Sequence, residues 1–217
     1  IIDRKTTSLL TPVSRDALKI ILSHLDREVS LITIADNKDP KSLELKDFVS
    51  EVAELNDLIS VEVYDKGTNP DIEKLCHADK FPILALLDSE KYYSGVKYHS
   101  IPSKEQLMAF GLTLYNLGGP GLLLDPDTAE RLLAIRHPMN IKICISPSCP
   151  ACADTTAAAV RLALLNPRIQ AEVIELDLFP EIQQQYNLYN IPALIINDES
   201  IHYDVKTMDE IIEVLSL

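Results

Sequence analysis

The chain has 217 residues, with 20 Lys and Arg against 33 Asp and Glu, so its formal net charge is −13. This acidity argues against a nucleic-acid partner, because neutralising phosphates takes clustered Lys and Arg. A hydrophobic content of 47% excludes a disordered chain. Because the sequence shows neither a membrane-spanning run nor a secretion signal, we expect a cytoplasmic protein without a membrane partner. It starts Ile-Ile-Asp without a Met, which indicates a processed chain or a piece of a longer one.

The first half is expected to alternate helices and strands. In chain order, apolar spacing predicts a helix at 14–25, a strand at 29–35, a helix at 43–55, a strand at 59–64, a helix at 70–76, strands at 83–87 and 92–96, and a helix at 104–117.

The second half shows the same order. The predicted elements are a helix at 127–135, a strand at 141–146, a helix at 150–165, a strand at 171–177, a helix at 180–186, strands at 193–197 and 200–203, and a helix at 207–217. Pro150 suits a first helical position, where its missing N–H costs nothing. This order predicts an α/β fold in which helices flank a mixed sheet.

The shared order reflects an internal repeat. Shifting the sequence by 110 residues aligns the halves without a gap over long stretches. The matched pairs include Asn56 and Asn166, Glu62 and Glu172, Pro70 and Pro180, and Pro82 and Pro192. Matched prolines within matched apolar patterns indicate duplication rather than chance. With Gly118-Gly119-Pro120-Gly121 as the boundary, the sequence predicts two domains, 1–117 and 118–217, each with a four-stranded mixed sheet.

A pair of cysteines marks the reactive site of the second half. Cys149-Pro150-Ala151-Cys152 lies where a predicted strand ends and a helix begins. The helix N-terminus favours a thiolate on Cys149 and lowers its pKa. Cys152, one turn further on, is expected to be shielded and to resolve a mixed disulfide. The pattern therefore predicts a redox-active dithiol.

The first half lacks this chemistry. The 110-residue shift places the dithiol motif on Asp39-Pro40-Lys41-Ser42, which retains the proline and has no sulfur. We expect this half to be redox-inert and to act as a platform or partner surface.

A metal site is not expected. Cys144, Cys149 and Cys152 copy the spacing of the first three ligands of a plant-type iron–sulfur site. However, Cys144 lies in a predicted strand and is interpreted as a small buried hydrophobe, and Cys76 lies upstream at an apolar helix position that favours a packed thiol. A zinc site would need a second pair of ligands.

Other polar residues are weaker candidates. Glu175 and Asp177 end the strand beside the dithiol and could move protons, form a solvated strand end or cap a helix. Tyr189 and Asn190 precede Pro192 and are expected to line a substrate groove. Four histidines are scattered and are expected at surface or loop positions: His77, His99, His137 and His202.

Pro192 is the second functional position. It lies 43 residues after Cys149 and just before an apolar strand, where proline interrupts the ladder. This placement resembles the thioredoxin fold, which puts a cis proline beside its dithiol. The resemblance implies a cis Ile191–Pro192 peptide and pairing of the Ile191 backbone with the substrate chain. The alternative is a trans proline on an edge strand.

The tandem arrangement resembles one family. Two thioredoxin-like folds, with a dithiol only in the second, are similar to the N-terminal domain of the flavoprotein component of alkyl hydroperoxide reductase. The similarity is strongest at 107–119, 132–137, 164–169 and 191–193. That family usually has His-Asn between the cysteines, where this chain has Pro150-Ala151. The resemblance implies that this dipeptide, with Ile191 and Pro192, contacts the partner.

The resemblance also implies a protein-disulfide oxidoreductase that relays electrons. A thioredoxin-reductase-like flavoprotein module carrying FAD and NAD(P)H would reduce the Cys149–Cys152 disulfide, and the dithiol would reduce a two-cysteine peroxiredoxin. The chain has no Gly-x-Gly-x-x-Gly stretch, so both cofactors are expected on an attached or partner module. A general protein disulfide reductase or isomerase, and a binding module with an incidental dithiol, are the alternatives.

Overall fold

The structure, a computed structural model, describes residues 9–217, so residues 1–8 of the predicted first domain lie outside the described residues. The first half contributes α1 (Pro12–Leu22), β1 (Val29–Ala35), α2 (Pro40–Ala53), β2 (Ile59–Asp65), α3 (Pro70–Leu75), β3 (Ile83–Leu87), β4 (Tyr93–His99), the 3₁₀ turn η1 (Lys104–Gln106) and α4 (Leu107–Gly118). The second half contributes α5 (Pro126–Leu133), β5 (Met139–Ile145), α6 (Pro150–Leu165), β6 (Ile169–Glu175), α7 (Pro180–Gln185), β7 (Ala193–Ile196), β8 (Ser200–Tyr203) and α8 (Met208–Leu215). Every predicted element is present, with bounds that differ by a few residues.

Two of the largest differences have identifiable structural causes. Helix α2 begins at Pro40 rather than at the predicted residue 43, because the side chain of Asp39 caps its first turn. Strand β4 continues to His99 rather than ending at residue 96, because Val96–His99 pairs with β6. The parallel neighbour extends the strand, and the sequence of β4 alone does not show that neighbour.

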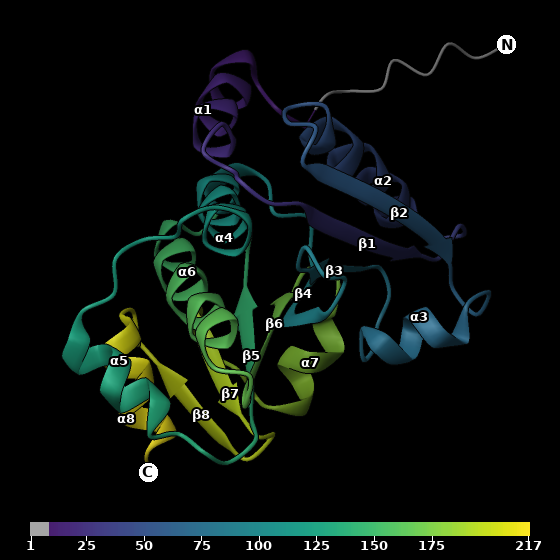
Figure 1. The fold of residues 1–217 in the computed structure, drawn as a ribbon. Coiled ribbons are helices and arrows are strands. Elements are labelled where there is room, and N and C mark those ends of the chain that lie inside the picture. Colours follow the sequence, from purple (N-terminus) through teal and green to yellow (C-terminus); the bar gives the residue numbers. More distant parts are fainter. Residues whose placement is uncertain (1–8) are drawn as a thin grey trace, which may run out of the picture.

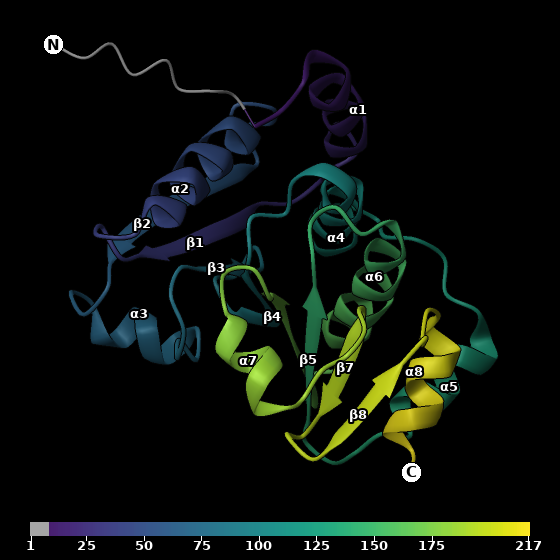
Figure 2. The same cartoon turned by 180° about the vertical axis from the view of Figure 1, so that it is seen from behind.

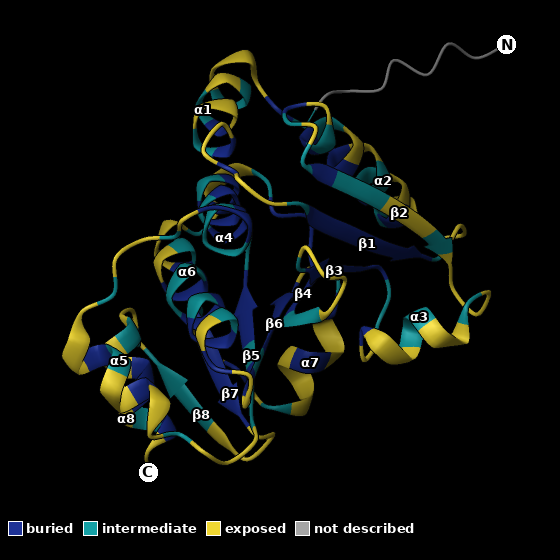
Figure 3. Ribbon diagram, in the orientation of Figure 1, coloured by how far each residue is buried: buried dark blue, intermediate teal, exposed yellow. Residues whose placement is uncertain are grey.

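All eight strands form one sheet in the order β2-β1-β3-β4-β6-β5-β7-β8. The four strands of each half therefore join edge to edge, through parallel pairing of β4 with β6. We call this junction the seam. The interior strands are buried, whereas the outermost strands β2 and β8 are partly exposed (Figure 3).

Helices cover both faces of the sheet (Figures 1 and 2). One apolar core joins α1, α2, α4, α6 and α8 to one face and runs through both halves. On the opposite face α3 and α7 each cover a separate small apolar cluster. Strands β1, β4, β5 and β6 point in the same direction, so their C-terminal ends lie at the same end of the sheet. The dithiol follows β5 at this end.

Candidate functional site: a disulfide at a helix start

The two cysteines of the second half are joined at the N-terminus of α6. Cys149 is the N-cap residue of this 16-residue helix, and its Sγ is bonded to Cys152 Sγ, with the Cα atoms 5.3 Å apart. Cys149 is half-buried, whereas Cys152 is completely buried. The backbone N–H of Cys152 donates to Cys149 Sγ at 3.2 Å. Burial shields Cys152. A thiolate on Cys149 after reduction, which this N–H and the helix dipole would favour, stays a prediction.

The proline beside the dithiol has the predicted conformation. The Ile191–Pro192 peptide is cis, which confirms the prediction, and the matched Phe81–Pro82 peptide of the first half is also cis. Ile191 packs against the same apolar core as Cys149, and Pro150 and Ala151 are exposed in the first turn of α6. Cys144 on β5 pairs with Ala193 on β7, so Ile191 and Pro192, which precede β7, lie at the end of the sheet where β5 leads into the dithiol loop. Contact of Ile191, Pro192 and this dipeptide with a partner stays a prediction.

A groove of about 250 Å³ opens next to the proline loop. Its lining residues come from the ends of β5 and β6, from α7 and from the proline loop: Ile145, Ser146, Leu176, Asp177, Gln183, Tyr189, Asn190 and Ile191. The carbonyl of Ser146 accepts the N–H of Cys149 at 3.2 Å, so the groove borders the dithiol loop. The prediction that Tyr189 and Asn190 line a groove is confirmed; its use by a substrate stays a prediction.

The matching position in the first half is a helix cap. The Asp39 carboxylate accepts the N–H of Lys41 at 3.0 Å. Ser42 is completely buried, and its hydroxyl accepts the N–H of Asp36 at 3.0 Å. Both side chains at the positions of the cysteines thus satisfy backbone donors, one in the first turn of α2 and one in the loop that precedes it. This explains why the backbone is retained where the sulfur atoms are not.

The other two cysteines are packed into apolar surroundings, as predicted. Cys76 lies in the cluster under α3, Cys144 in the cluster under α7, and both are completely buried. Burial raises the pKa of Cys76 to about 11 and that of Cys144 to about 12, so both are neutral thiols at pH 7. Since Cys149 and Cys152 are bonded to each other, the iron–sulfur spacing does not correspond to an assembled ligand set.

The two carboxylates that end β6 differ in environment. Glu175 is 8% exposed and accepts the N–H of Ile101 at 3.4 Å, whereas Asp177 is exposed. Burial raises the pKa of the Glu175 carboxyl above its usual range. A solvated strand end therefore describes Asp177 and is wrong for Glu175. Proton transfer by Glu175 stays a prediction.

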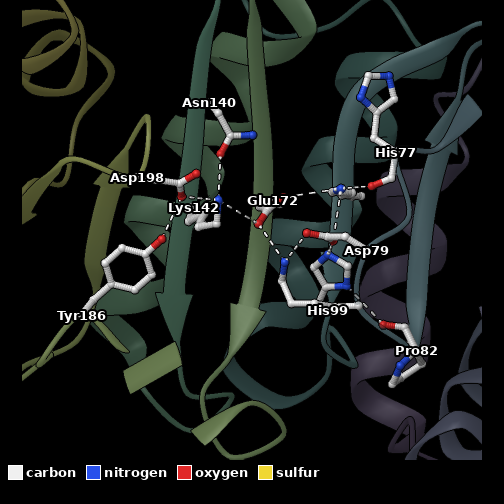
Figure 4. Close-up of polar contacts among 11 residues, drawn as sticks. His77, Asp79, Pro82, His99, Asn140, Lys142, Glu172, Tyr186 and Asp198 are labelled. Carbon is white, nitrogen blue, oxygen red and sulfur yellow. Dashed lines mark hydrogen bonds and ion pairs between the residues drawn. The ribbon is translucent and has the colours of Figure 1, made fainter. Parts of the chain in front are cut away.

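An ion cluster around the buried Glu172 at the seam was not predicted from the sequence (Figure 4). The Glu172 carboxylate on β6 is 4% exposed and lies 3.4 Å from Lys97 Nζ on β4. Lys80 Nζ and Lys142 Nζ, one from each half, lie 3.6 Å from it. Asp79 adds a second carboxylate, 2.6 Å from Lys80 Nζ and 3.7 Å from Lys97 Nζ. These five side chains, with Asp198 and His99, form what we call the seam cluster.

His99 corrects a prediction. Its side chain was expected at the surface or in a loop, but it is completely buried on β4. The ring Nδ1 lies 3.3 Å from the Pro82 carbonyl, to which it donates, and Nε2 lies 3.6 Å from Asp79 Oδ1. Burial lowers the pKa of His99 to about 4, so the ring is neutral at pH 7.

The seam cluster also contains three groups that are able to bind a metal. Ligand atoms of Asp79, His99 and Glu172 lie within 4.8 Å of one another. However, the ammonium groups of Lys80 and Lys97 already contact both carboxylates. A divalent cation would have to displace these ammonium groups or withstand their repulsion. The cluster therefore fits an internal ion network better than a metal centre.

Comparison with known proteins defines the class and then the family. Residues 139–216 match the thioredoxin domain family. A thioredoxin-like fold that holds a cysteine pair at a helix start beside a cis proline is that of a thiol–disulfide oxidoreductase. The chain is 36% identical to a solved structure of the alkylhydroperoxide reductase AhpF from Enterococcus faecalis, with a TM-score of 0.92, covering 96% of this chain and 100% of that one. The chain belongs to the AhpF family and corresponds to its N-terminal domain.

More distant relatives agree with this assignment. An alkyl hydroperoxide reductase of the AhpF type from Pseudomonas aeruginosa is 25% identical over 84% of this chain and 32% of its own length. The chain thus spans about a third of the curated relatives that it matches. A protein disulfide oxidoreductase from Aeropyrum pernix, 20% identical, shares the fold over 97% of this chain and 93% of its own, with a TM-score of 0.83. Within residues 9–217, no helix has the length and apolar character that crossing a membrane requires.

Proposed function

We propose that this chain relays electrons, as a protein-disulfide oxidoreductase module, from a flavoprotein reductase to a two-cysteine peroxiredoxin. The observation that carries the proposal is the disulfide between half-buried Cys149 and buried Cys152 at the start of α6. Membership of the AhpF family supports the choice of partners, because the relatives are named alkyl hydroperoxide reductases.

The chemistry needs two electrons per cycle. Reduction of the disulfide delivers two electrons and two protons and gives two thiols. The Cys149 thiolate then attacks one sulfur of the partner disulfide, forming a mixed disulfide and releasing the other partner sulfur as a thiolate. Cys152 next attacks Cys149 Sγ, releases the second partner sulfur and restores the intramolecular disulfide. The protons given up by Cys149, on forming its thiolate, and by Cys152 pass to the two released partner thiolates, so the partner leaves as a dithiol.

The cofactors belong elsewhere in this scheme. Because the sequence has no Gly-x-Gly-x-x-Gly stretch, FAD and NAD(P)H are assigned to an attached or partner thioredoxin-reductase-like module. The relatives are about two and a half times as long as this chain, which leaves room for such a module in proteins of this family. We also propose the cytoplasm as the location, where pyridine nucleotides and reduced thiols are available.

Reconstitution tests the proposal. The chain, a flavoprotein thioredoxin-reductase module, NADH, a two-cysteine peroxiredoxin and hydrogen peroxide are mixed, and NADH oxidation is followed. Wild type should sustain peroxide-dependent turnover. Cys149→Ser should abolish it, and Cys152→Ser should accumulate a mixed disulfide with the peroxiredoxin that is visible by non-reducing electrophoresis. Cys76→Ser is the matched control and should turn over like wild type, because Cys76 is buried beneath α3.

Two outcomes would reject the relay. Reduction of insulin by the chain with dithiothreitol, without turnover of the peroxiredoxin, would favour a general disulfide reductase. Peroxiredoxin binding that is equally tight for wild type and Cys149→Ser, with no turnover by either, would favour a binding module.

A further inference from the structure

The groove beside the proline loop has an uneven chemical lining. Its floor is apolar, with Ile145 at the end of β5, Leu176 after β6 and Ile191 before the cis proline. Its rim is polar and contains exposed Asp177, the one formally charged residue among those that line it. A volume of about 250 Å³ suits one long side chain better than a segment of chain.

Tyr189 adds an aromatic surface to the rim. Its side chain is 81% exposed although it is large and apolar. The ring packs against that of Tyr203 with centroids 4.3 Å apart, which fixes its position. An aromatic ring held in place at the mouth of a groove offers its π-electrons to a cation, and a nearby carboxylate strengthens that preference.

The matched positions of the first half have a different lining. Under the 110-residue shift, Asp177 corresponds to Gly67, and Tyr189 corresponds to Asp79, which faces the seam cluster. At the positions of Ser146 and Ile191 the first half has its own carboxylate and aromatic ring, Asp36 and Phe81, and both already contact Lys66. The matched place in the first half therefore holds a cation of the chain itself, whereas Asp177 and Tyr189 are exposed in the half that retains the dithiol.

We propose that the groove selects a Lys or Arg side chain of the partner, close in sequence to its reactive cysteine. The inference rests on the proposed function and deepens it. The aliphatic stem would lie on Ile145, Leu176 and Ile191, and the cationic head would reach Asp177 and the face of Tyr189. Ser146 lines the groove and accepts the N–H of Cys149, and Ile191 precedes the strand that pairs with the end of β5, so an extended partner chain whose sulfur reaches Cys149 brings its neighbouring residues to the groove.

Peptide substrates test the inference on the full chain. Each probe is a short peptide with one cysteine in a mixed disulfide with thionitrobenzoate, and a Lys, Gln or Glu is moved through the positions on either side of that cysteine. The Cys149 thiolate of the reduced protein attacks the peptide sulfur and releases coloured thionitrobenzoate. Cys152 then attacks Cys149 Sγ, so the peptide leaves as a thiol and the protein as a disulfide. The second-order rate constant of colour release is measured for each peptide.

A position-specific preference is expected. At one position the Lys peptide should react about three to ten times faster than the Gln peptide, and the Glu peptide should react more slowly than both, as for a partly exposed ion pair. Asp177→Asn should bring the Lys-to-Gln ratio close to one, and Asp177→Lys should invert it. Asp154→Asn is the matched control, since Asp154 is exposed near the dithiol on α6 but does not line the groove; its ratio should equal that of wild type.

The outcomes separate the two proposals. Equal rates for Lys, Gln and Glu peptides at every position would overturn the inference, as would a loss of preference in Asp154→Asn as large as in Asp177→Asn. The Gln peptides report dithiol reactivity alone, so their failure to react with wild type would instead reject the disulfide exchange of the proposed function.

Discussion

Glu172 is the carboxylate that contacts three lysines of the seam cluster, and replacing it with Gln tests how much its charge contributes to stability. Glu172→Gln keeps the size of the side chain and removes the one carboxylate that contacts Lys97, Lys80 and Lys142 together. Lys97, which is 5% exposed, keeps only Asp79 at 3.7 Å and the carbonyl of His77. Lys80 and Lys142 are less affected, because each retains an aspartate at 2.6 Å.

The partners that the three lysines retain determine how much stability Glu172→Gln should remove. Removing one partner of a buried ion pair costs roughly 3–5 kcal/mol. Because two of the three lysines keep a close carboxylate, we expect the lower end, a loss of about 3 kcal/mol in the free energy of unfolding. Urea unfolding at pH 7 measures this loss. Added salt should leave it nearly unchanged, since buried charges are screened weakly.

The repeat supplies a matched control. Glu62, which corresponds to Glu172 in the first half, is exposed on the outer strand β2. Glu62→Gln should change the free energy of unfolding by less than about 0.5 kcal/mol. Adding Lys97→Met to Glu172→Gln should restore part of the loss, because it removes the ammonium left without its main partner. Equal effects of Glu172→Gln and Glu62→Gln, or no recovery in the double variant, would refute this account of the seam.

Three further predictions concern single side chains. Because the pKa of His99 is about 4 in the fold and about 6.5 unfolded, only the unfolded chain gains this proton as the pH falls between these values. Unfolding titrations should therefore show that wild type loses about 3 kcal/mol more than His99→Gln between pH 7 and pH 4, and parallel curves would contradict the burial of a neutral ring. Asp39→Ala removes the cap of α2 and should cost about 1 kcal/mol in urea unfolding while leaving peroxiredoxin turnover intact; lost turnover would show that the first half takes part in the chemistry. After reduction, a maleimide should label Cys149 in the native protein and reach Cys76 and Cys144 only after unfolding, as read by mass spectrometry of the peptides; rapid native labelling of Cys144 would disprove its shielding.

Much of this fold could be predicted from short-range patterns in the sequence. The paired prolines and apolar runs of the repeat predicted the order of elements, because each signal acts within a few residues of the chain. The dithiol was equally readable, since two cysteines three residues apart at a strand-to-helix transition need no distant partner. The cis Ile191–Pro192 peptide came from the resemblance to thioredoxins, and the sequence around it would not have shown it alone.

The seam cluster escaped prediction because it depends on which strands are neighbours. Glu62 and Glu172 occupy matched positions on matched strands. β2 is an outer strand, so Glu62 is exposed, whereas β4 covers the side of β6 and buries Glu172. His99 was misplaced for the same reason, since the pairing with β6 carries β4 past residue 96. The hydrophobic pattern within either half does not show which strand of the other half it pairs with.

The continuous sheet gives the first half a structural role although it lacks the cysteine pair. Separating the two halves between residues 117 and 118 would expose unpaired backbone N–H and C=O groups on two interior strands, β4 and β6. Exposed strand edges of this kind tend to pair with strands of other molecules. It would also part Glu172 from two of its three ammonium partners. We therefore expect a fragment that carries only the dithiol half to self-associate through the exposed edge of β6.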